Sequence, residues 1–77
     1  MLFLVEYDRR RGQLVSLQTY PESQREKAGE ARLAKELNLQ REGVEREVVM
    51  LDAASEEALR KTHRRYFETV QTLARAS

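Results

Sequence analysis

Two short segments of the chain, residues 2–5 and 48–51, are apolar at every position. A strand with one face in water alternates apolar and polar residues, because successive side chains point to opposite faces of a sheet. These two segments do not alternate, so each is expected to be a strand that is covered on both faces. Only two segments of the remaining sequence read as helices, so we expect another chain to cover one face of the sheet.

The start of the chain predicts a β-hairpin. Residues 2–8 and 13–20 read as strands, and the run Asp8-Arg9-Arg10-Arg11-Gly12 joins them. Aspartate opens such turns by accepting hydrogen bonds from backbone N–H groups just ahead of it, and glycine closes them because it tolerates positive φ. The first strand places Phe3, Val5 and Tyr7 on one face and Leu2, Leu4 and Glu6 on the other.

The middle of the chain predicts a helix and a third strand. Pro21 ends the second strand because it cannot donate to a strand ladder. Ser23 followed by Glu26 fits a capping box, so a helix is expected over residues 23–40, with Gly43 near its C-cap. The apolar face of this helix is thin and consists of Ala31, Leu33, Ala34 and Leu37. Residues 44–51 are the expected third strand.

The end of the chain predicts the most regular helix. Ser55 is the expected N-cap, and Glu56 and Glu57 lie in the first turn, where the helix dipole favours carboxylates. The helix is expected to run from residue 56 to residue 73 or 74. At ~100° per residue, one stripe of this helix collects Leu59, His63, Tyr66, Val70 and Leu73.

These elements predict a single α+β domain over residues 1–77, in the order β-β-α-β-α. A right-handed crossover makes the third strand parallel to the second, and the first strand then lies between them. The sheet is therefore three-stranded and mostly antiparallel, with strand order 2-1-3, and its third strand is an apolar edge. Our leading hypothesis is a homodimer or accessory module that acts through protein contact. The candidate interface residues are Leu2, Leu4, Val48 and Met50.

The charge distribution supports a first alternative, a nucleic-acid-binding module. A formal net charge of +1 argues against nonspecific nucleic-acid binding by the chain as a whole. Basic residues nevertheless gather at the hairpin tip and on the polar side of the last helix. The candidate nucleic-acid contacts are Arg9, Arg10, Arg11, Arg60, Lys61, Arg64 and Arg65.

A second alternative is a small-molecule pocket around His63, the only histidine, with Tyr7 and Tyr66. A catalytic or metal site needs a cluster of chemical groups. The sequence shows no nucleophile motif, no glycine-rich phosphate loop and no companion metal ligands for His63. We therefore expect no catalytic residue, metal or cofactor. The chain has no cysteine and no apolar run near the ~20 residues of a membrane span. A cytoplasmic protein is expected.

Overall fold

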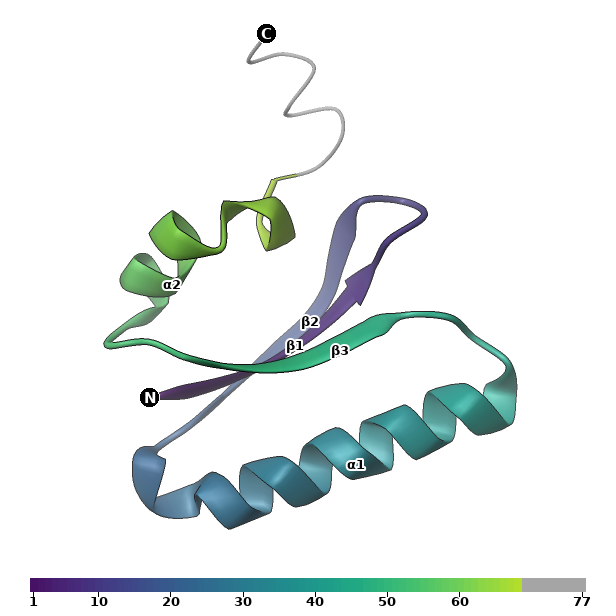
Figure 1. Cartoon of the computed structure of the whole chain (residues 1–77), viewed down its shortest axis with the longest axis horizontal. Coiled ribbons are helices and arrows are strands. Elements are labelled where there is room, and N and C mark those ends of the chain that lie inside the picture. The colour runs from purple at the N-terminus through teal and green to yellow at the C-terminus, as the bar shows by residue number, and fades with distance from the viewer. Residues whose placement is uncertain (69–77) are drawn as a thin grey trace, which may run out of the picture.

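A computed structural model describes residues 1–68 and shows an α+β fold with the predicted order β-β-α-β-α (Figure 1). Its elements are β1 (Leu2–Asp8), β2 (Gln13–Tyr20), α1 (Arg25–Glu42), β3 (Glu47–Asp52) and α2 (Glu56–Thr62), with short 3-10 turns at Glu22–Gln24 and Arg64–Tyr66. Both strands of the hairpin have their predicted bounds, and β3 begins three residues later than expected, at Glu47 rather than at Val44.

The sheet has the predicted order β2-β1-β3, and β1 is antiparallel to both neighbours. In the hairpin turn, the Asp8 carboxylate accepts a hydrogen bond from the Arg11 N–H at 3.1 Å, and Gly12 adopts a φ of 63°. The aspartate and the glycine therefore play the roles that the sequence predicts for them. β1 lies in the centre of the sheet, as expected for a strand that is apolar on both faces.

Each face of the sheet is covered by a helix of the same chain: α1 lies on one side and α2 on the other (Figure 1). Leu2, Leu4 and Glu6 belong to the α1 face, whereas Val5 and Tyr7 pack on the α2 face against Tyr66. The expectation that a second chain must cover one face is wrong. Leu2 and Leu4 are only 1% and 0% exposed within a single chain.

The ends of α1 differ in how well they were predicted. The predicted capping box is wrong, because Ser23 lies inside the 3-10 turn and the N-cap residue, Gln24, makes no side-chain capping hydrogen bond. At the other end, Gly43 is the C-cap in the left-handed region with a φ of 69°. The Val44 N–H donates to the Leu39 carbonyl at 2.9 Å and closes the helix end.

The face that α1 turns toward the sheet also differs from the prediction. Leu33 and Leu37 point outward and are 56% and 47% exposed, and Ala34 is exposed as well. The residues that are buried or half-buried are Ala28, Ala31, Lys35 and Leu39, at helical spacing. Lys35 explains this orientation, because its ammonium lies 3.2 Å from the buried Glu6 carboxylate. The small Ala28 and Ala31 let the helix approach the sheet closely.

The last helix is shorter than predicted, since α2 ends at Thr62 and the chain turns at His63 into the 3-10 turn. The Thr62 hydroxyl donates to the Ala58 carbonyl at 3.0 Å, a local bond that competes with the helix ladder. The turn brings the Tyr66 ring to 5.2 Å from the Tyr7 ring in an edge-to-face contact. The predicted stripe residues Val70 and Leu73 lie outside the described residues.

Candidate functional site

The outer edge of β3 pairs with no other strand among the described residues. The segment 48–51 is half-buried at every position, although nothing pairs with its outer side in the single chain. Proteins usually protect such edges with lysine, proline or a bulge. Between Glu47 and Asp52 the strand has no lysine, no proline and an uninterrupted register with β1. This edge is therefore able to pair with another strand.

The backbone groups that face outward from β3 can be identified. The Ala53 N–H donates to the Met1 carbonyl at 3.1 Å, and these two residues continue the β1–β3 register. In an antiparallel ladder, hydrogen-bonded and non-hydrogen-bonded pairs alternate. Val49 and Leu51 consequently turn their N–H and C=O groups toward β1. The N–H and C=O groups of Val48 and Met50 point out to the open edge.

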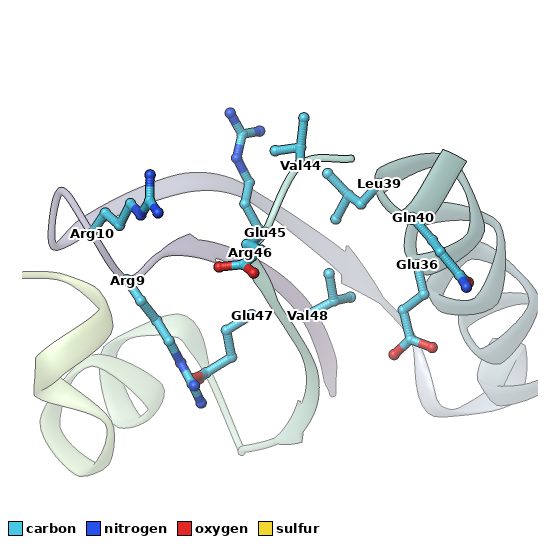
Figure 2. Close-up of a pocket in the computed structure, with 10 residues that line it drawn as sticks. All are labelled: Arg9, Arg10, Glu36, Leu39, Gln40, Val44, Glu45, Arg46, Glu47 and Val48. Carbon is cyan, nitrogen blue, oxygen red and sulfur yellow. The ribbon is translucent and has the colours of Figure 1, made fainter. Parts of the chain in front are cut away.

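A cavity of about 550 Å³ lies at the N-terminal end of β3 (Figure 2). The hairpin tip, the C-terminal half of α1 and the segment from Val44 to Val48 surround it. Its walls are mixed: Leu39, Val44 and Val48 are apolar, Gln40 is neutral and polar, and the other lining residues are charged. The charged residues are Arg9, Arg10, Glu36, Glu45, Arg46 and Glu47. A second, smaller cavity of about 410 Å³ adjoins it and shares Arg10 and Arg46.

Glu47 is the first of two buried carboxylates near this edge, and it lies on the α2 face. Its carboxylate is 2.8 Å from Arg9 Nε and 2.7 Å from Arg65 Nη2, and it also accepts a hydrogen bond from the Tyr66 hydroxyl. The Arg65 guanidinium lies over the Tyr66 ring, 4.2 Å from its centroid. Glu47 thereby ties the hairpin tip, β3 and the turn after α2 to one another.

Glu6 is the second buried carboxylate, and it occupies the opposite face of the sheet. Arg46 Nη1 lies 2.5 Å from one of its oxygens, and Lys35 Nζ lies 3.2 Å from the other. The Ser16 hydroxyl adds a longer contact of 3.5 Å from β2. Glu6 thereby links β1 to α1 and to the loop that precedes β3.

The surroundings of the two carboxylates favour their charged forms. Burial acts to raise the pKa of the Glu6 carboxyl, but hydrogen bonds from Arg46 and Lys35 outweigh it and the pKa is lowered. Burial likewise opposes ionisation of Glu47, and hydrogen bonds from Tyr66 and Arg9 lower the pKa of its carboxyl. Burial and the bond to Glu47 raise the pKa of the Tyr66 hydroxyl. Both carboxylates serve as structural anions, each already bound to its cations.

These lowered pKa values predict that the fold loses stability in acid. In the unfolded chain both glutamates protonate near their ordinary pKa of 4.5, whereas the folded protein resists protonation. The stabilisation is therefore complete at neutral pH and decreases as the pH falls below that value. Denaturant titrations at a series of pH values measure the free energy of unfolding. A free energy of unfolding that is constant from neutral pH to pH ~3 would contradict the stabilising role of the Glu6 and Glu47 carboxylates.

The structure separates the four candidate interface residues into two groups. Leu2 and Leu4 are buried in β1 under α1 and present no accessible surface. Val48 and Met50 are half-buried on the α1 face of the edge strand, and their backbone groups point outward. An interface prediction can therefore rest only on Val48 and Met50.

The candidate nucleic-acid contacts are largely engaged by carboxylates of the same chain. Arg9 and Arg65 bind Glu47, and Arg11 lies 3.9 Å from Asp8. Three further candidates each lie within 4.0 Å of an acidic side chain. These pairs are Arg60 with Glu56, Lys61 with Glu57, and Arg64 with Glu68. Among the described residues, Arg10 alone of the seven candidates has no such neighbour. Phosphate binding would compete with these pairs.

The three candidate pocket residues do lie together. The rings of His63 and Tyr66 are stacked with centroids 6.4 Å apart, and Tyr66 contacts Tyr7. Tyr7 and Tyr66 are buried in the core, while His63 is half-buried and its Nδ1 lies 2.9 Å from the Thr62 hydroxyl. The tyrosines therefore fill the space between helix and sheet, and a small-molecule pocket around His63 stays a prediction.

The two carboxylates Glu6 and Glu47, and the cations of Glu6, Lys35 and Arg46, are not among the predicted site residues. One signal was available for Glu6, because it interrupts the otherwise apolar run of β1. A charged residue inside a buried strand is rarely left without a partner. No pattern in the sequence, however, tells which cations reach it, because Arg46 is separated from Glu6 by forty residues.

Residues 1–68 contain no group of three or more histidine, aspartate or glutamate side chains arranged to hold a metal ion, and no helix among them is long and apolar enough to cross a membrane. We compared the chain with protein-family models, curated proteins and solved structures, and found no significant match in any of the three comparisons. Its function is therefore inferred from its own residues and their geometry.

Proposed function

We propose that this protein is an association module that forms a homodimer by pairing the β3 edges of two copies. The observation that carries the proposal is the open edge of β3, where Val48 and Met50 have outward N–H and C=O groups and where residues 48–51 place apolar side chains on both faces. Antiparallel pairing of two β3 strands satisfies those backbone groups and completes the burial of the side chains. It also joins two three-stranded sheets into one continuous sheet.

Edge-to-edge pairing is favoured over face-to-face packing for a steric reason. Each face of the sheet already carries a helix, so a second sheet cannot reach the buried Leu2 and Leu4. The other edge, β2, is less suited to pairing because Ser16, Gln18 and Thr19 make it more polar. Among the described residues, the apolar edge at β3 is thus the better docking surface.

Met50→Pro tests this function, because proline removes one N–H that points to the open edge and leaves the ladder with β1 intact. We expect parent protein and Met50→Leu to have the mass of a dimer by light scattering at high micromolar concentration, and Met50→Pro to be monomeric. Circular dichroism establishes that each variant is folded. A second variant, Val48→Lys, keeps the amide but places a charge at the edge, and it is also expected to be monomeric.

Two outcomes would overturn this function. Folded Met50→Pro and Val48→Lys proteins that keep the parent's dimeric mass would locate the interface elsewhere. A parent protein that stays monomeric, and that instead binds generic RNA or DNA with a steep dependence on salt, would favour the nucleic-acid alternative at the hairpin tip.

A further inference from the structure

The large cavity lies across the open edge of β3 and not on one face of the sheet. Glu47 and Val48 are consecutive strand residues, so their side chains point to opposite faces. Both residues nevertheless line the cavity, together with Arg9 of the hairpin tip and Leu39 of α1. Figure 2 shows Arg9 and Leu39 on opposite sides of β3. A chain that pairs with the edge of β3 would therefore run directly into the cavity.

The symmetry of a dimer restricts how two β3 strands can pair. In an antiparallel sheet, directly opposite residues share a face. A two-fold axis perpendicular to the sheet leaves the side chain of each residue on the same face in both copies. A residue can therefore lie opposite only residues that share its face, which are an even number of positions away. The axis must then pass between one residue and the same residue of the second copy. The middle of the strand, Glu47–Asp52, lies between Val49 and Met50, so that residue is one of these two or one of their neighbours, Val48 and Leu51.

The charged side chains distinguish these four registers. With Val48 on the axis, Arg46 lies opposite the apolar Met50 of the second copy; with Met50 or Leu51 on the axis, Asp52 lies opposite Val48 or Met50. With Val49 on the axis, Val48 lies opposite Met50, Glu47 lies opposite Leu51 and Arg46 lies opposite Asp52, so among the four this register alone sets a cation against a carboxylate at the strand ends. Opposite charges directly across two strands stabilise a sheet.

We infer that the β3 strands pair with Val49 on the two-fold axis, and that the cavity receives the end of the second copy's β3. This inference rests on the proposed homodimer. Leu51 and Asp52 of the second copy then lie opposite Glu47 and Arg46, in the cavity wall. The Asp52 side chain is 58% exposed and already lies 3.5 Å from the N-terminal amine and 3.3 Å from Arg25 Nη2, so Arg46 of the second copy joins or displaces these cations. Each cavity is completed by a residue of the other copy.

The size of the edge supports this filling of the cavity. A strand of six residues that rises ~3.3 Å per residue, in a sheet layer ~10 Å thick, offers only about 200 Å² of edge. A specific interface usually covers about 800 Å² per partner. Strand pairing alone therefore falls short, and the walls of the cavity, from the hairpin tip to Leu39, supply further contact area.

Single-cysteine variants test the register, because the chain has no cysteine of its own. The outward backbone groups belong to Val48 and Met50, so Val49 and its copy form a non-hydrogen-bonded pair with Cα atoms about 4.5 Å apart. This distance is within the ~4.4–6.8 Å that a disulfide spans. We expect Val49→Cys to form a disulfide-linked dimer under mild oxidation, seen on a non-reducing gel. Val48→Cys and Met50→Cys are the matched controls and should remain largely uncrosslinked.

The outcomes separate this inference from the proposed function. Disulfide formation by Val48→Cys or Met50→Cys in place of Val49→Cys would overturn the register while the β3 homodimer stands. A dimeric mass with no crosslink in any of the three variants would overturn both the register and the β3 interface. A monomeric mass for the reduced parent protein would refute the homodimer itself.

Discussion

Replacing Leu59 with alanine is expected to destabilise the fold by about 2–5 kcal/mol, the usual range for a leucine truncated in a packed core. Leu59 is 0% exposed and is among the largest fully buried side chains of the described residues. It is the one buried residue of α2, so it fixes the helix on its face of the sheet. The loss is a large part of the ~5–15 kcal/mol that stabilises a typical domain. Urea or heat denaturation followed by circular dichroism measures it.

The chain offers a control with the same chemistry. Leu33 also lies on a helix but is 56% exposed, so Leu33→Ala is expected to change the free energy of unfolding by less than about 0.5 kcal/mol. Equal stability losses in Leu59→Ala and Leu33→Ala would show that α2 does not pack on the sheet as described.

Replacing Glu6 with glutamine is the second substitution for which we expect a large effect. Glutamine has nearly the same shape but leaves Lys35 and Arg46 without their carboxylate. Hydrogen bonds to charged groups contribute about 1.5–3 kcal/mol each, and both partners are partly exposed, so we expect a total loss of about 2 kcal/mol. Chemical denaturation at neutral pH measures this change.

The control for Glu6→Gln is Glu45→Gln, since Glu45 is an exposed carboxylate of the loop that precedes β3. We expect this variant to stay within about 0.5 kcal/mol of the parent. The difference between the two variants should vanish in acid, where Glu6 itself is protonated. A Glu6→Gln protein as stable as the parent at neutral pH would show that its two cations are satisfied by water.

The strands were predictable from the sequence because each carries a local signal. Asp8 and Gly12 mark the hairpin turn, Pro21 ends β2, and the crossover rule then fixes β1 in the centre. The apolar character of the segment 48–51 marks the edge strand that we propose as the interface. These signals lie within a few residues of the elements that they define.

The helices were harder to predict because tertiary contacts overrode their local patterns. The orientation of α1 depends on Lys35 reaching Glu6, and a lysine does not mark a helix face as buried. The end of α2 depends on Tyr66 turning back to donate to Glu47. Both errors come from buried carboxylates whose partners are distant in sequence. The cavity could not be predicted either, since it is formed by the hairpin tip, α1 and β3 together.

Sedimentation equilibrium of the parent protein measures whether the β3 edge joins two copies. The chain has a mass of 9.0 kDa. We predict a mass that rises toward twice this value as the protein concentration increases from low to high micromolar, and a constant single-chain mass for Met50→Pro. A parent protein that keeps the mass of one chain throughout this range would show that the β3 edge does not join two copies.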